Sequence, residues 1–141
     1  MGLPGIDVNL LAVLVAAIAS IIIGSLWYSP LLFGNTWIKL MGFSKRDMEK
    51  AKQKGMAGSY FVTLIASIVM GYVMAYLIYF MSVAIVIDGI MLGVLAWLGF
   101  IVPLLIGNVL WDGKPMKLFF IHAFYWLVNV IVMSAILTAW K

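Results

Sequence analysis

The chain contains no cysteine and very little charge, and both absences narrow what it can be. Without cysteine it can form no disulfide, no thiolate metal site and no cysteine nucleophile. Charged residues make up 10% of the 141 residues, whereas soluble domains carry about a quarter. Hydrophobic residues make up 66% of the chain. A surface this apolar has to be solvated by lipid, so the sequence indicates an integral membrane protein.

Acidic residues are even fewer than basic ones, but the resulting net charge of +4 does not indicate a nucleic-acid partner. Most of the basic residues lie in one connecting segment between two apolar runs, where loop charge orients a membrane protein. We therefore expect a partner in membrane lipid and none in nucleic acid. The basic residues of this segment are Lys39, Lys45, Arg46, Lys50, Lys52 and Lys54.

Four apolar runs are each long enough to cross about 30 Å of hydrocarbon, which takes roughly 20 helical residues. They predict an all-α integral membrane fold, a single domain with transmembrane helices at residues 6–27, 59–81, 89–110 and 116–140. Residues 1–9 contain no Lys or Arg, so the first run is expected to be a retained helix and not a signal peptide.

Basic residues are distributed unevenly between the two sides of the membrane. Eight fall in the connections between the first and second and between the third and fourth runs, and Lys141 alone falls on the opposite side. This bias predicts a cell-membrane protein with both termini outside the cytosol. Residues 44–55 are expected to form a cytosolic helix, capped by Ser44 and ended by Gly55. That helix could anchor the chain on anionic lipid, but a merely solvated helix is the favoured interpretation.

Small residues recur every four positions in three of the four runs, which is typical of helices that pack closely in lipid. The third run has two such faces, one with Gly89 and Gly93 and another with Gly99, Pro103 and Gly107. One face could serve the bundle and the other a second copy, or both could serve the bundle, and we expect a homo-oligomer. The other stripes are Ala12, Ala16, Ser20 and Gly24, and Ser59, Thr63, Ser67, Gly71 and Ala75.

Pro103 lies inside the third run, where its ring and missing amide disrupt the bond to the Gly99 carbonyl and predict a hinge. The sequence around it, PLLIGN, is nearly repeated as PLLFGN earlier in the chain, at Pro30, Gly34 and Asn35. This similarity suggests two helical hairpins in parallel orientation, an arrangement found in transporters.

Ionisable and amide side chains at membrane depth are the candidate functional residues. Asp88, at the expected start of the third helix, is either a helix cap or an ion site, and capping is favoured. His122 and Asn129 share a face of the fourth helix, and Asn108 lies at a similar depth on the third. They are either a polar pathway or interhelical hydrogen bonds, and the structural interpretation is slightly favoured.

The string Trp27-Tyr28-Ser29-Pro30-Leu31-Leu32-Phe33-Gly34, followed by Asn35-Thr36-Trp37, Trp97-Leu98-Gly99-Phe100 and a Lys-rich turn, resembles the family called domain of unknown function 1761. The resemblance spans nearly the whole chain. It implies a small four-helix membrane protein and brings no activity, substrate or catalytic residue.

The sequence offers no catalytic constellation: no paired carboxylates, no HExxH motif and no cysteine. We therefore expect no enzyme, no catalytic residue, no metal and no cofactor. The leading hypothesis is a homo-oligomeric conduit or carrier for a small solute or ion of unknown identity. The alternative is a structural, accessory or lipid-binding protein without transport activity.

Overall fold

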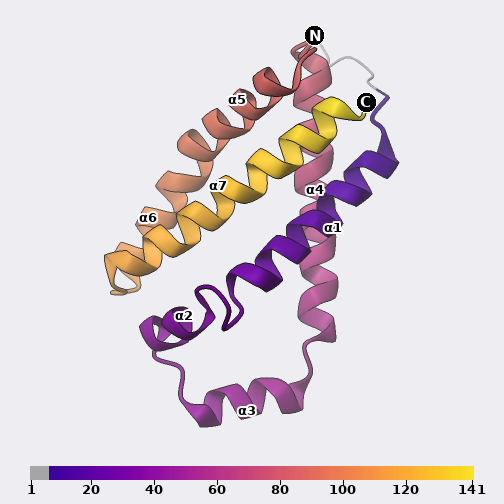
Figure 1. The fold of residues 1–141 in the computed structure, drawn as a ribbon. Coiled ribbons are helices and arrows are strands. Elements are labelled where there is room, and N and C mark those ends of the chain that lie inside the picture. Colours follow the sequence, from indigo (N-terminus) through magenta and orange to yellow (C-terminus); the bar gives the residue numbers. More distant parts are fainter. Residues whose placement is uncertain (1–6) are drawn as a thin grey trace.

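The computed structural model describes residues 7–141, and all regular secondary structure in that range is helical (Figure 1). This confirms the expected all-α fold class. Four segments are long and apolar enough to cross a membrane: residues 10–27, 57–80, 86–111 and 116–139. The elements are α1 (Leu10–Trp27), α2 (Gly34–Met41), α3 (Lys45–Lys54), α4 (Ala57–Phe80), α5 (Val86–Ala96), a π-helical turn η1 (Trp97–Ile101), α6 (Val102–Trp111) and α7 (Met116–Ala139).

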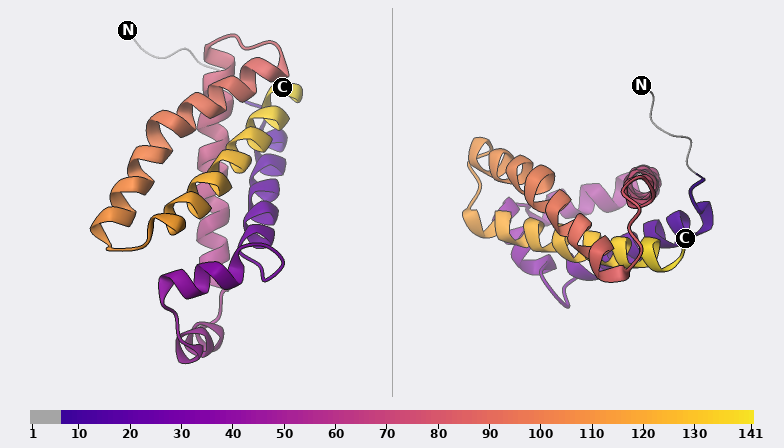
Figure 2. Two further views of the ribbon diagram at one scale, coloured as in Figure 1. Left: turned by 60° about the vertical axis from the view of Figure 1, so that its left-hand side comes forward. Right: turned by 90° about the horizontal axis from the view of Figure 1, so that it is seen from above.

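Helix α7 is the centre of the bundle. It contacts α5 and α6 on one side and α1 and α4 on the other (Figures 1 and 2). The core where α1, α4 and α7 meet lies toward the end of the molecule that carries the C-terminus, and it is built from alanine, branched aliphatic and methionine side chains. Its fully buried members include Ala12, Ala16, Ile78, Met133 and Leu137.

Glycines let α5 lie very close to α7. A Cβ atom on Gly89 would stand 1.8 Å from the Thr138 Oγ1 atom, and one on Gly93 would stand 2.2 Å from the Ser134 Oγ atom. Both hydroxyls donate to carbonyls of their own helix: Ser134 to the Val130 carbonyl at 2.5 Å, and Thr138 to the Ser134 carbonyl at 2.7 Å. The glycine pair therefore packs within the bundle, as its spacing indicates.

The second face of the third span is uncovered. Nothing lies within 4 Å of a Cβ atom built on Gly99 or Gly107, and Pro103 is exposed. The π-helical turn η1 precedes Pro103, and within it the amide of Val102 donates to the Trp97 carbonyl five residues back. A π-turn is one way in which a helix adapts to a proline, so the irregularity falls where Gly99 and Pro103 were predicted to form a hinge.

Helices α1 and α4 pack closely over only half of their length. The buried residues of α1 end at Ser20, and those of α4 begin at Ser67. Within residues 57–66 every residue except Leu64 is exposed. The predicted stripes of small residues thus pack in one half of the span, while Gly24, Ser59 and Thr63 in the other half do not bring the two helices together.

The segment after α1 differs from what the sequence led us to expect in two ways. Helix α2 was not predicted, because its eight residues are too few for a span and follow a turn. The similar strings also differ in structure: residues 30–33 form turns before α2, whereas Pro103 and its followers continue as helix α6. The two similar six-residue strings therefore adopt different backbone conformations.

Helix α3 has the predicted caps. The Ser44 hydroxyl accepts from the Asp47 amide at 3.1 Å, and the Asp47 carboxylate accepts from the Ser44 amide at 2.8 Å. The bond from the Ser44 amide, followed by the interaction with the Ser44 hydroxyl, holds the pKa of the Asp47 carboxyl below its usual value. Gly55 ends the helix with a φ of 83°.

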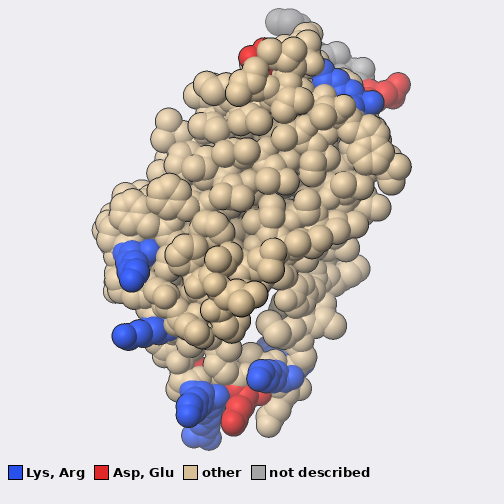
Figure 3. All heavy atoms as spheres, in the orientation of Figure 1, with Lys and Arg blue, Asp and Glu red and all other residues tan. Residues whose placement is uncertain are grey.

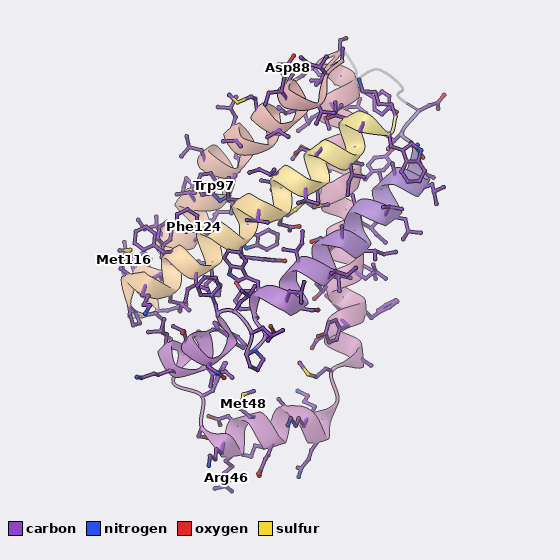
Figure 4. All side chains as sticks on the ribbon, in the orientation of Figure 1. Arg46, Met48, Asp88, Trp97, Met116 and Phe124 are labelled. Carbon is purple, nitrogen blue, oxygen red and sulfur yellow. The ribbon has the colours of Figure 1, made fainter. Side chains whose placement is uncertain are left out.

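Charge is concentrated at the two ends of the molecule. Figure 3 shows a broad surface free of charged side chains, bounded by a mainly basic cluster at the α3 end, by further basic side chains at the left edge, and by a few charged residues at the end that carries the C-terminus. Arg46 and Asp88 mark these opposite ends in Figure 4. The uncharged band between them is what a lipid-facing surface requires.

Candidate ligand cavity at the α3 end

The turn after α1 positions two aromatic residues against α7. The amide of Gly34 donates to the Ser29 carbonyl at 2.8 Å, and that of Phe33 donates to the Trp27 carbonyl at 2.9 Å. Only glycine fits at position 34, since a Cβ atom there would stand 2.5 Å from the Tyr28 carbonyl oxygen. The compact turn fixes Trp27 and Tyr28 at the end of α1.

Trp27 and Tyr28 both bond to α7. Trp27 Nε1 donates to the Ile121 carbonyl at 3.1 Å, and the Tyr28 hydroxyl lies 2.5 Å from His122 Nδ1. Burial, followed by the nearby Tyr125 phenol, raises the pKa of the Tyr28 phenol, so its hydroxyl keeps its proton at neutral pH. When Tyr28 donates that proton, Nδ1 is the acceptor and Nε2 carries the ring proton.

A cavity of about 450 Å³ lies where α1 and α4 diverge. This volume is within the range of sites that hold small molecules. Hydroxyl groups line it from three elements, and no charged side chain does so. The lining residues are Ile21, Gly24, Ser25, Tyr28, Trp37, Met56, Ser59, Tyr60, Thr63, His122 and Tyr125. We call this space the hydroxyl cavity.

A second cavity of about 330 Å³ lies on the other side of His122, between α6 and α7. Asn108, Asp112 and Lys114 line it, and the Lys114 ammonium donates to the Met41 carbonyl at 3.1 Å. His122 is the residue common to both linings. Both cavities lie toward the end of the molecule that holds α2, α3 and the α6–α7 turn.

The predicted polar cluster is only partly assembled. His122 and Asn108 line the same cavity, but the bond of His122 is to Tyr28, and the hydrogen bonds of the described residues include none between His122 and Asn108. Asn129 is fully buried away from both cavities, and neither its Oδ1 nor its Nδ2 atom has a partner among the described residues. Trp97, which is in neither lining, faces α7 (Figure 4), and its Nε1 donates to the Ala123 carbonyl at 2.7 Å.

Asp88 is not the helix cap that the sequence suggested. Helix α5 begins at Val86, so Asp88 lies in the first turn, and its side chain makes no capping bond. A carboxylate there still interacts favourably with the positive end of the helix dipole. Residues 7–141 contain no group of three His, Asp or Glu side chains placed to hold a metal.

Of the remaining predicted residues, Pro30 and Asn35 are exposed and lie outside both cavities. Tyr125, Ser59 and Thr63 were not predicted as site residues. The hydroxyls of Ser59 and Thr63 were counted only as part of a packing stripe, although serine and threonine also serve as polar lining.

The comparison with known families covers the segment that forms the turn after α1. A family model described as protein of unknown function (DUF1761) matches residues 11–138. The chain belongs to this family. The match covers α1 to α7, including the turn that places Tyr28 against His122, and it confirms the resemblance found in the sequence. No curated protein and no solved structure matches the chain.

Membership of DUF1761 assigns no function to the chain and no role to any residue, and the four long apolar helices indicate a membrane protein. The roles of its side chains have to be argued from the cavities themselves.

Proposed function

We propose that this DUF1761 protein is a non-enzymatic membrane protein that binds an amphiphile in the hydroxyl cavity. The observation that carries the proposal is the divergence of α1 from α4, which leaves a cavity lined by hydroxyls, aromatic rings and one imidazole. Such a lining suits a ligand with an apolar body and a few hydrogen-bonding groups. The N-terminal half of α4 borders the cavity and is exposed, so a lipid in the membrane could reach the cavity from that side.

Binding is favoured over conduction because both cavities lie in one half of the bundle. The other half is closed by the core around Ala12, Ala16 and Ile78. A pathway across the membrane would have to be completed by further copies of the chain. A conduit is kept as the second candidate because His122 lines both cavities and could connect them.

The orientation is part of the proposal. The basic residues of the α2–α3 segment and the α6–α7 turn support placing that end in the cytosol and both termini outside. The hydroxyl cavity would then lie in the cytosolic half of the cell membrane.

A tryptophan placed inside the cavity tests the proposal. Thr63→Trp fills the hydroxyl cavity, whereas Val62→Trp, at a neighbouring exposed position outside the lining, is the matched control. In native mass spectra recorded from mild detergent, we expect one retained lipid-like adduct per chain for wild type and Val62→Trp. Thr63→Trp should lose it.

Equal retention by all three proteins would reject the cavity as the binding site. The same spectra give the number of subunits. A defined oligomer would favour the conduit, because several chains could share a pathway, and a ligand-bound monomer would exclude it.

A further inference from the structure

Helix α3 lies across the open end of the bundle, between the end of α2 and the start of α4 (Figure 1). Its basic side chains make up much of the cluster at the lower end of the molecule (Figure 3). The helix is therefore placed beside the hydroxyl cavity, since Met56, Ser59 and Tyr60, which line that cavity, follow α3 directly in the chain.

The two ends of α3 differ in charge. Lys52 and Lys54 occupy the last turn, next to the cavity-lining start of α4, and are exposed. Asp47 lies in the first turn, where its carboxylate bonds to the Ser44 amide at 2.8 Å. Lys45 and Arg46 lie at that far end together with the carboxylate, so the far end presents cations beside an acid, and the end nearest the cavity presents cations alone.

The cavity lining itself carries no formal charge. A ligand that occupies it has to leave any charged group outside, because an unpaired charge in a low-dielectric site costs much free energy. A group left at the α3 end would meet the ammonium groups of Lys52 and Lys54. The uncharged lining and the adjacent cations together select an amphiphile with a neutral body and an anionic head.

We propose that the ligand of the hydroxyl cavity is an anionic membrane lipid whose headgroup is held by Lys52 and Lys54. This inference rests on the proposed function, because it names the class of the amphiphile that binds there. The chain would contact the lipid in two places. The hydroxyls and aromatic rings of the cavity would surround the uncharged body of the lipid, and the ammonium groups of Lys52 and Lys54 would bind its phosphate.

Charge reversal at the two ends of α3 provides the test. Lys52→Glu/Lys54→Glu changes the end nearest the cavity, and Lys45→Glu/Arg46→Glu changes the net charge equally at the far end. Arg46 points away from the bundle, whereas Met48 lies on the side of α3 that faces it (Figure 4). Each protein is titrated with phosphatidylglycerol or phosphatidylcholine of identical chains, and bound lipid is measured by native mass spectrometry.

We expect wild type and Lys45→Glu/Arg46→Glu to prefer phosphatidylglycerol. Lys52→Glu/Lys54→Glu should bind phosphatidylglycerol about tenfold more weakly than wild type, since each basic residue near an anionic lipid headgroup contributes to the affinity. Its binding of phosphatidylcholine should be unchanged, which also shows that this variant is folded.

The failures are distinguishable. Equal binding of both lipids by wild type would overturn the anionic class and leave the cavity as an amphiphile site. A preference that survives in Lys52→Glu/Lys54→Glu, or falls equally in both variants, would overturn the assignment to these two lysines. Retention of neither lipid by wild type would overturn the proposed function itself.

Discussion

Single glycines decide how closely the helices approach one another, and they do so at some positions and not at others. Gly93 lies against the Ser134 hydroxyl and the Val130 carbonyl of α7, with no space for a methyl group. Gly107 belongs to the same span and has open space around it. Sequence spacing alone gives the two residues similar weight, because both occur in small-residue stripes.

Gly93→Ala should therefore destabilise the fold, whereas Gly107→Ala should not. We expect Gly93→Ala to lower the free energy of unfolding by about 1 to 3 kcal/mol, since overpacking forces α5 away from α7. Gly107→Ala should be neutral or stabilising, because alanine favours helix by roughly 1 kcal/mol over glycine. Circular dichroism during titration with sodium dodecyl sulfate measures both. A larger loss for Gly107→Ala would contradict the packing described here.

At the scale of the element, α3 is a helix fixed by its caps. It has no buried residue, so packing contributes little to it. The reciprocal bonds between Ser44 and Asp47 define its first turn, and Gly55 ends it. Its order therefore depends on local bonds and on its attachment to α2 and α4.

Ser44→Ala should loosen the start of α3. We expect faster amide hydrogen exchange in its first turn and a rise in the pKa of the Asp47 carboxyl toward its ordinary value of about 3.9. The rise should be partial, because the backbone amide of residue 44 can still donate. Because the pKa of this carboxyl is depressed in the folded helix, the cap contributes its full stabilisation at pH values above the ordinary pKa. That stabilisation is lost as the pH falls through the depressed pKa.

NMR titration of the Asp47 carboxyl carbon in both proteins measures the change. An unaltered pKa with unaltered amide exchange would mean that the capping box does not hold the first turn.

The elements that sequence predicts well are those set by length and composition. Four apolar runs of about 20 residues mark the four candidate spans, because a bilayer requires such runs. Helix α2 was missed because it is short and begins with Gly34. The signal that could have revealed it is Gly42, a left-handed stop with a φ of 76° after apolar residues at helical spacing, Trp37, Ile38, Leu40 and Met41.

The site was less predictable than the fold for a specific reason. The pairing of Tyr28 with His122 joins residues 94 positions apart, and no local pattern indicates it. His122 and Asn108 could be placed together because a short turn connects their helices. Ser59 and Thr63 were assigned to packing, since sequence spacing does not show where two helices diverge.

At the scale of the whole molecule, the bundle has a packed half and an open half. The core at the terminal end joins α1, α4 and α7, and the hydroxyl cavity separates α1 from α4 at the α3 end. Ligand binding in that cavity should therefore change the separation of α1 and α4 in one half only.

Spin labels measure this separation directly, and a chain without cysteine needs no background substitutions. Leu26→Cys with Val62→Cys labels exposed positions outside the lining on the two helices that flank the cavity, and Leu14→Cys with Val73→Cys labels exposed positions over the packed half. We expect the first pair to give a broad distance distribution that narrows when lipid is added. The second pair should give one narrow distribution under both conditions, and a shift there instead would argue for rearrangement of the whole bundle.

The partial packing of α4 has a mechanical consequence. Its buried residues begin at Ser67, so its first ten residues, almost three turns, project beyond the part that is packed in the bundle. A small rotation about the packed part would displace the N-terminal end of α4 by a larger distance, and α3 is attached to that end. Occupancy of the cavity would then be reported as movement of a water-facing helix, which is the behaviour of a sensor and requires no passage across the membrane.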